Sequence, residues 1–256
     1  MPEKALFITK LEDVKYLDNN WERLYFGNEF CQHLLPPPED IIKVIDFTKK
    51  NNLDLSLVTP VLNSAGVLKA RDILRLFAEY YPGGEVVIND WGMLGECRKY
   101  SLEPIVGRLL TKQKRDPRIK KIMFRLAPMA QKRFKESGIN PGYAAFLKEN
   151  NIKHIELDCL LQGMDETFCR ANGLCLSLYL PYGYISTTRR CIFNNNGFGH
   201  CSKECQKHSF RLRHPSFDNA LLLKGNTLFF DNKIGSKDVL MIDGLKRIVY
   251  QPTLPI

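Results

Sequence analysis

Three cysteines lie close together in a polar part of the chain. The segment RRCIFNNNGFGHCSKECQKH, residues 189–208, holds Cys191, Cys201 and Cys205 among asparagine, glycine and lysine. Thiolates bind structural zinc and iron–sulfur clusters, and they also act as nucleophiles and redox centres. The segment therefore indicates disulfides, a metal site or a reactive thiol, or else surface thiols with no chemical role.

The redox state of the cellular compartment helps to choose among these possible roles of the cysteines. The N-terminal stretch MPEKALFITKLEDVK has charges where a signal peptide needs an apolar core, so we expect a cytoplasmic protein. In a reducing compartment disulfides are rare, and clustered cysteines more often bind metal or carry out redox chemistry. Because no run reaches about 18 consecutive apolar residues, we expect no membrane span.

The composition is that of a protein with an ordinary core and an excess of positive charge. The chain has 256 residues, of which 44% are hydrophobic and 25% charged, enough for one large domain or two small ones. The net charge is +9, and the densest basic segment is KQKRDPRIKK, Lys112–Lys121. Such a segment could bind RNA, an acidic partner or an anionic substrate, but without interleaved aromatic residues it also fits a solvated helix face.

The elements that must position the cysteines alternate between strand and helix. Apolar runs predict strands at residues 4–10, 22–30, 53–60, 85–90, 103–107, 152–160 and 174–181. Helical patterns cover residues 36–52, 65–84, 116–137 and 142–151, with a break at Pro128. This order favours parallel strands joined by helical crossovers.

Seven strand–helix units before residue 181 fit an α/β fold with a TIM-like (β/α) barrel, complete or incomplete, better than a doubly wound sheet. No glycine-rich phosphate fingerprint is present. After the cysteine loop, residues 220–232 predict a hairpin and residues 238–252 a strand pair. We therefore expect the barrel with its cysteine-rich loop over residues 1–215, and a C-terminal β-hairpin extension packed on it over residues 216–256.

In such a barrel, the loops that follow the strands open on one face. Cys31 follows the second predicted strand, in YFGNEFCQHL, so we expect it to meet Cys191, Cys201 and Cys205 over the barrel mouth. Four thiolates suit a structural zinc ion or an iron–sulfur cluster. Cys201 and Cys205 form a short pair, Cys191 is a looser neighbour, and Cys31 is remote in the sequence. This spacing fits an iron–sulfur cluster better than a zinc ion, because the cluster is wider. On spacing alone, zinc and unligated thiols stay open as alternatives.

Polar side chains at other strand ends could carry out catalysis. Asp158 lies near the end of the sixth predicted strand, and Asn89 and Asp90 hold the same place on the fourth. They could line a pocket and include the acid and base of a hydrolase, or they could cap helices and bind backbone groups. Arg108 and Arg189 could offset the negative charge of a cofactor or bind an anion.

The chain resembles the peptidase U32 family, the collagenase-like proteases. Within it, the likeness is to the short single-barrel members that support oxygen-independent hydroxylation in ubiquinone biosynthesis. The stretches that carry it are YFGNEFC, VVINDWG, PIVGRLLTKQKRDPRI, and LPYGYISTTRRC with HCSKEC. The resemblance implies a 4Fe–4S cluster bound by Cys31, Cys191, Cys201 and Cys205, and a hetero-oligomeric partner of the same family.

Three functions follow as expectations. The first is a redox component of oxygen-independent hydroxylation that acts on a small organic substrate together with a partner subunit. The second is a U32-type peptidase, with carboxylates as acid and base and a metal site that only holds the loop. The third is an RNA-modification factor that binds through Lys112–Lys121. Since the chain has no G-x-S-x-G or H-E-x-x-H motif, the redox reading is favoured.

Overall fold

The computed structural model describes residues 1–256 except 137–139, 166, 195–200, 234–238, 240–241 and 243. Its centre is a closed barrel with the strand order β1-β12-β7-β6-β5-β4-β3-β2. The barrel strands are β1 (Glu3–Ile8), β2 (Arg23–Gly27), β3 (Asp54–Thr59), β4 (Glu85–Ile88), β5 (Glu103–Val106), β6 (His154–Asp158), β7 (Cys175–Leu180) and β12 (Leu245–Tyr250). Neighbouring strands are parallel all round, so the predicted TIM-like barrel is confirmed, and it is complete.

The eighth barrel strand comes from the end of the chain. The predicted strand pair at residues 238–252 is wrong for the described residues, because these contain one strand, β12, which lies between β1 and β7. Residues 238, 240–241 and 243 of that prediction lie outside the described residues. A local pattern cannot identify partners far away in the sequence. β12 thus belongs to the barrel although it lies beyond residue 216, the predicted start of the extension.

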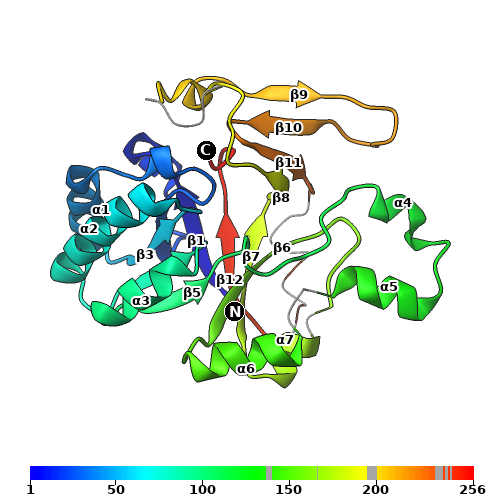
Figure 1. The fold of residues 1–256 in the computed structure, drawn as a ribbon, viewed down its shortest axis with the longest axis horizontal. Helices are drawn as coiled ribbons and strands as arrows, with labels where there is room; N and C mark the ends of the chain where they lie inside the picture. Colours follow the sequence, from blue (N-terminus) through cyan, green and yellow to red (C-terminus); the bar gives the residue numbers. More distant parts are fainter. Residues whose placement is uncertain (137–139, 166, 195–200, 234–238, 240–241, 243) are drawn as a thin grey trace.

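A second sheet lies over the end of the barrel toward which β12 points (Figure 1). It is antiparallel, in the order β8-β11-β10-β9. Its strands are β8 (Tyr182–Thr187), β9 (Phe210–Leu212), β10 (Leu221–Lys224) and β11 (Thr227–Asp231). β10 and β11 form the hairpin predicted for residues 220–232, with Gly225 and Asn226 at its turn. In the described residues, this sheet therefore lies in the chain between β7 and the last barrel strand.

Helices α1, α2 and α3 lie along one side of the barrel, and α6 and α7 lie near its lower end in the view (Figure 1). The α-helices are α1 (Pro38–Lys50), α2 (Ser64–Tyr80), α3 (Gly92–Lys99), α4 (Ile119–Met123), α5 (Pro128–Lys135), α6 (Pro141–Glu149) and α7 (Thr167–Ala171). Short 3-10 helices are η1 (Leu11–Tyr16), η2 (Gln32–Leu34) and η3 (Glu204–Gln206). α1 begins with proline, and acidic residues occupy its first turn and lysines its last, which suits the helix dipole. The break predicted at Pro128 is confirmed, since this residue begins α5.

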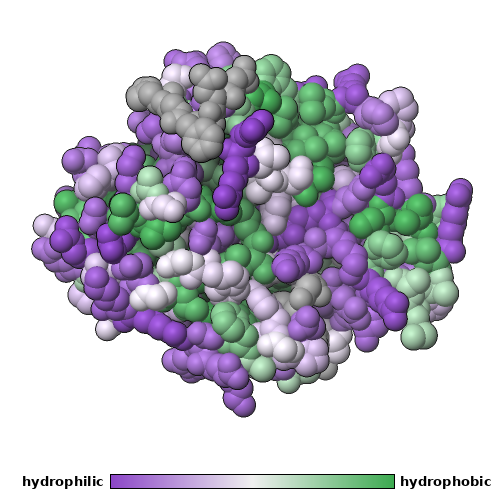
Figure 2. Space-filling view, viewed as in Figure 1, coloured by the Kyte–Doolittle hydropathy of each residue, from purple (hydrophilic) through white to green (hydrophobic). Residues whose placement is uncertain are grey.

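The segment that contains α4 and α5 projects from the barrel and carries apolar side chains at its surface. Ile122, Phe124 and Met129 are exposed there. Figure 2 shows hydrophobic atoms among hydrophilic ones over this segment, at the right of the view. Within the described part of the chain, no helix has the length and hydropathy of a membrane span.

Alternation along the strands gives the barrel two apolar layers. Outward side chains such as Leu6 and Leu24 pack beneath the helices in the main core. Inward side chains include Phe7, Tyr25 and Tyr179, whose rings meet edge to face inside the barrel. Because these aromatic rings fill its middle, the barrel is a packed core rather than a pore.

Charged groups close the barrel at the end where the strands begin. Glu3 accepts hydrogen bonds of 2.6 Å from both Arg23 and Arg247. Glu85 lies 2.9 Å from Arg247 and 3.1 Å from Arg23, and these arginines hold the pKa of Glu85 at about 2 against burial. Each carboxylate therefore meets two guanidinium groups, which compensates their shared removal from water.

Glu156 is the buried carboxyl group in the middle of the barrel. The hydroxyl of Tyr179 donates to its Oε2 over 2.6 Å. Burial raises the pKa of Glu156 from 4.5 to about 8, and the charge of Glu29 also raises it. The native state therefore keeps this side chain protonated at neutral pH.

Replacing Glu156 by glutamine should remove a pH dependence of stability. Between pH 4.5 and about 8 the native state holds a proton that the unfolded chain has released, so the unfolding free energy falls as pH rises. Over that range, Glu156→Gln should gain stability relative to wild type by up to about 1.4 kcal/mol per pH unit. Urea denaturation at several pH values measures this difference. The exposed Glu149→Gln variant is the control, and parallel curves for Glu156→Gln and wild type would contradict the assignment.

Candidate functional site

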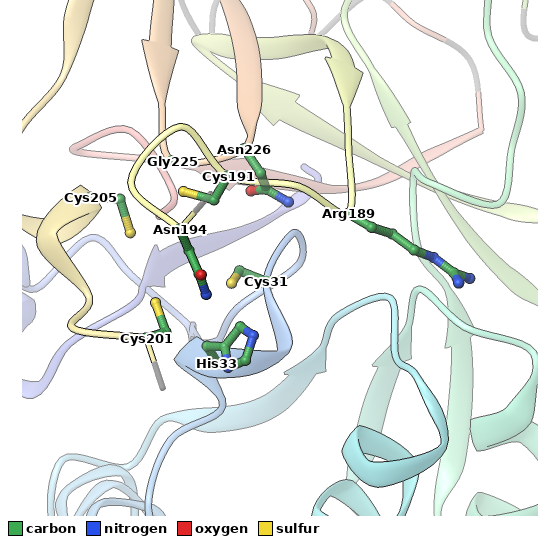
Figure 3. Close-up of a pocket in the computed structure, with 9 residues that line it drawn as sticks. All are labelled: Cys31, His33, Arg189, Cys191, Asn194, Cys201, Cys205, Gly225 and Asn226. Carbon is green, nitrogen blue, oxygen red and sulfur yellow. The ribbon is translucent and has the colours of Figure 1, made fainter. Parts of the chain in front are cut away.

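The four cysteines predicted as metal ligands face one small cavity at the end of the barrel (Figure 3). Its volume is about 20 Å³, and Cys205 is buried whereas the other three are half-buried. The lining residues are Cys31, His33, Arg189, Cys191, Asn194, Cys201, Cys205, Gly225 and Asn226. In Figure 3 the four sulfur atoms point toward a common space. The structure thus brings an early thiol together with three late ones.

Cys31 is positioned by the sharp turn that ends β2. Gly27 has φ +139°, and a Cβ there would lie 2.1 Å from the carbonyl oxygen of Val58, so only glycine fits this close approach to β3. Asn28 then accepts hydrogen bonds at its Oδ1 from the N–H groups of Phe30 and Cys31, at 3.0 and 2.8 Å. This turn holds Cys31 at the start of the helix η2.

The late cysteines lie on loops that pack against the second sheet. Cys191 follows β8 and forms a short bridge with Asn194. Cys205 lies in η3, where it packs in an apolar cluster that includes Phe30 and Phe229. Gly225, at the β10–β11 turn, has φ +58°, and a Cβ added there would lie 3.4 Å from that of Cys205. The hairpin turn therefore forms part of the cavity wall.

Asn226 ties the cysteine loops to one another. Its Nδ2 donates to the carbonyl oxygen of Phe30 over 2.8 Å and to that of Thr188 over 2.6 Å. The first carbonyl belongs to the residue before Cys31, and the second lies three residues before Cys191. One amide group thus fixes the distance between two cysteine-bearing loops that are far apart in the sequence.

The electrostatics of the cavity favour a positively charged occupant. Burial raises the pKa of the Cys31 thiol, and Cys201 and Cys191 raise it further, against a hydrogen bond from the N–H of His33. Burial, together with the neighbouring cysteines, raises the pKa of Cys205 to about 11. Four thiolates this close repel one another, so they become stable together when positive charge lies between them.

The donor set fits an iron–sulfur cluster. Four cysteine sulfurs around one cavity are the usual ligands of a 4Fe–4S cluster, and no aspartate or glutamate of the described residues lines the cavity. Among the described residues, no group of three or more His, Cys, Asp or Glu side chains is arranged as a metal-ion site. Cys31, Cys191, Cys201 and Cys205, which line the cavity together, are the residues that would hold such a cluster.

Beneath the cysteine cavity, Arg108 is fully buried at the centre of an ionic network. Its Nε and Nη2 donate to the two oxygens of Glu29 over 3.0 and 2.6 Å, and its Nη1 donates to Asp158 over 2.7 Å. Its guanidinium also lies 4.0 Å from the ring centre of Tyr179. This network joins the ends of β2, β5 and β6, and Arg108 does not line the cysteine cavity.

Asp158 has both of its carboxylate oxygens occupied. Oδ1 accepts from Arg108, and Oδ2 accepts from Arg115 over 2.8 Å. The side chain of Gln113 pairs with the backbone of Asp158 through both its amide nitrogen and its oxygen. The carboxylate is fully buried, which suits the positioning of two arginines better than proton transfer to a substrate.

Asn89 and Asp90 lie in a different pocket of the barrel mouth, beside Trp91. The Nδ2 of Asn89 donates to the carbonyl of Thr59 over 3.0 Å. The carboxylate of Asp90 accepts from the N–H groups of Gly92 and Leu62, over 2.9 and 3.1 Å. Both side chains therefore bind backbone groups around the pocket, one of the roles that the sequence left open, whereas the N-cap of α3 is Trp91.

The basic segment Lys112–Lys121 divides between the interior and the surface. Gln113 and Arg115 are buried in the network around Asp158, whereas Lys112 and Lys114 are exposed. Lys121 pairs with Asp218 over 2.9 Å. Part of this segment therefore supports the barrel mouth, which its composition did not indicate.

Sequence reasoning missed the residues that position the cysteines. Gly225 and Asn226 were recognised only as a turn, because nothing local shows where a hairpin turn lands. Gln113 and Arg115 were read as part of a charged surface. The amino-acid sequence carries no signal for this, because the residues from Lys112 to Arg115 read KQKR and are polar at every position. Only the structure shows that exposed and buried positions alternate there, as in an extended segment.

Removal of the Asn226 amide should loosen the cysteine loops. In Asn226→Ala the carbonyl groups of Phe30 and Thr188 lose their shared donor, so the unfolding free energy should fall by about 1–3 kcal/mol. Chemical denaturation measures the change. The matched control is Asn219→Ala, at an exposed position in the β9–β10 connection. Equal stability of the two variants would mean that Asn226 does not hold the loops.

Comparison with known proteins supports the fold. No protein-family model and no curated protein sequence matches the chain. Among solved structures, that of the U32 peptidase Mk0906 is similar over 100% of this chain and 95% of that chain, with a TM-score of 0.54 and 9% sequence identity. The chain therefore has the fold of a U32 peptidase structure, as the sequence resemblance led us to expect.

Proposed function

We propose that this chain is an iron–sulfur protein of the U32 type that serves as a redox component in the modification of an organic substrate. Cys31, Cys191, Cys201 and Cys205 would hold a 4Fe–4S cluster. The observation that carries the proposal is the single cavity that all four sulfur atoms line. When bound, such a cluster exchanges single electrons.

The residues around the cysteines suit this role. The N–H of His33 donates to the Cys31 sulfur, and hydrogen bonds of this kind stabilise a thiolate and adjust the potential of a cluster. Cys205 is buried among apolar side chains, which limits access of water. Arg189 also lines the cavity, although its guanidinium extends away from the sulfur atoms. With four cysteine ligands the protein completes the coordination of the iron, which fits electron transfer better than Lewis-acid hydrolysis.

The contacts of the carboxylates favour this function over a hydrolase. A peptidase that used Asp158 as its base would need a free carboxylate oxygen, whereas both oxygens accept hydrogen bonds from arginines. Asp90 is engaged with backbone N–H groups. We therefore assign these two residues to the support of the barrel mouth.

The resemblance to the short U32 members extends the proposal. It implies hydroxylation without molecular oxygen and a partner subunit of the same family. The charged N-terminal stretch adds the expectation of a cytoplasmic protein. RNA binding through Lys112–Lys121 is supported less, because Gln113 and Arg115 of this segment are buried.

Anaerobic purification followed by iron and acid-labile sulfide analysis tests the cluster. Wild type should contain about four iron and four sulfide per chain. Cys191→Ala/Cys205→Ala, which removes two of the four ligands, should lose nearly all of both. Cys175→Ala is the control, since Cys175 begins β7 at the other end of the barrel and should leave the iron content unchanged.

Circular dichroism of each variant separates loss of ligands from loss of folding. Full iron content in the folded double variant would overturn the ligand assignment. Stoichiometric zinc with little iron in wild type would replace the cluster by a structural zinc site, and the redox function would then fail.

A further inference from the structure

A larger pocket opens directly beside the cysteine cavity. Its volume is about 430 Å³, and it shares Cys31, His33, Arg189 and Asn226 with the cysteine cavity. Here it is called the arginine pocket; its lining residues are Phe30, Cys31, Gln32, His33, Val61, Leu62, Asn63, Thr187, Thr188, Arg189, Arg190 and Asn226. A molecule bound there would lie against the same cysteine that helps to enclose the small cavity.

The charge of the arginine pocket is entirely positive. Arg189 and Arg190 line it, and no aspartate or glutamate in the described part of the chain does. Both arginines are exposed, and within the described part of the chain neither guanidinium has a hydrogen bond or ion pair with another protein group. In Figure 3 the side chain of Arg189 extends away from the sulfur atoms. Two unpaired guanidinium groups at a pocket wall favour an anionic ligand.

Several neutral polar groups of this pocket already have partners within the protein. The Oε1 of Gln32 accepts from the N–H of Asn63 over 2.8 Å, and the Oδ1 of Asn63 caps α2 through the N–H of Gly66. The amide of Asn226 donates to two carbonyl groups of the cysteine loops. The two arginines are therefore the polar groups best placed to recognise a ligand.

An apolar path leads away from the arginines. Phe30, Val61 and Leu62 line the arginine pocket, and Val61 and Thr187 are shared with the pocket beside Trp91, whose volume is about 320 Å³. Here that second space is called the tryptophan pocket; its lining residues are Val61, Asn89, Asp90, Trp91, Leu109, Leu110, Tyr184 and Thr187. Apolar walls with few charged groups are typical of pockets that bind organic molecules.

We propose that the two pockets together bind an organic anion with an extended apolar body. The anionic headgroup, a carboxylate or phosphate, binds Arg189 and Arg190. The body passes Val61 toward Trp91 and lies alongside Cys31. This inference rests on the proposed function, for which it specifies the chemical class of the substrate.

Isothermal titration calorimetry on the anaerobically purified protein tests the inference with three probes: 2-naphthoate, 2-naphthyl phosphate and the neutral 2-naphthamide. One or both anions should bind at least about ten-fold more tightly than the amide, because a charge-assisted bond to guanidinium contributes more than a neutral one. The tighter anion identifies the headgroup.

Two variants test the two ends of the site. Arg189→Gln/Arg190→Gln should weaken the binding of the anions about ten-fold or more and leave the affinity for the amide unchanged. Arg125→Gln/Arg133→Gln, an equal charge change in the exposed α4–α5 segment, should leave all three affinities as in wild type. Val61→Asp adds a charge to the apolar path, so it should weaken the binding of the amide and of the anions alike.

Equal binding of anions and amide, no binding of any probe, or unchanged anion affinity in Arg189→Gln/Arg190→Gln would overturn the inference. Iron and sulfide are measured on the same samples. A protein with full iron that binds no probe refutes the substrate class alone. A protein that binds the anions without containing iron refutes the proposed function and leaves the anion site standing.

Discussion

The mouth of the barrel depends on one buried guanidinium, that of Arg108. It pairs with Glu29 and Asp158, and it also donates to the carbonyl oxygen of Tyr182 over 2.8 Å, so it joins the ends of three barrel strands to the start of the second sheet. Ions removed from water are costly unless every charge meets a partner and the remaining donors are satisfied. The buried network meets this condition with Arg115 as a second cation for Asp158. Since Glu29 lies two residues before Cys31, the network also fixes the base of the loop that carries the first cysteine.

The second sheet lies over the barrel mouth and gives the cysteine loops a support that the loops of a regular barrel do not provide. In a regular barrel a helix joins each strand to the next. Here the described residues between β7 and β12 include four antiparallel strands over the end where parallel strands place their active sites. Three cysteines lie on its loops, and its hairpin turn places Asn226 between the early and late cysteine segments. Because an antiparallel hairpin is stiff and its turn is short, it can hold a small cavity more firmly than one long loop.

The charged groups of the barrel ends differ from those of the pockets in whether they have partners within the protein. The buried carboxylates and arginines of the barrel ends are paired with one another, so they contribute to the arrangement of strands and loops. The cysteines enclose a cavity without any carboxylate, and Arg189 and Arg190 border an open pocket beside it without protein partners among the described residues. The ions that pair with one another thus support the barrel ends. The cysteines and the two arginines, in contrast, lie where a cluster and a substrate could meet.

The sequence by itself determined the barrel class, the seven strands from β1 to β7, the β10–β11 hairpin, and the convergence of four cysteines on one face. These follow from short-range periodicity and from the rule that the loops after parallel strands share one end of a barrel. Only the tertiary structure decided that residues 245–250 close the barrel, that Asn226 joins the cysteine loops, and that Asp158 serves two arginines. The physical reason is the same in each case. A strand, an amide or a carboxylate has a local propensity but no local partner, and its role is fixed by a group that the chain brings to it from far away in the sequence.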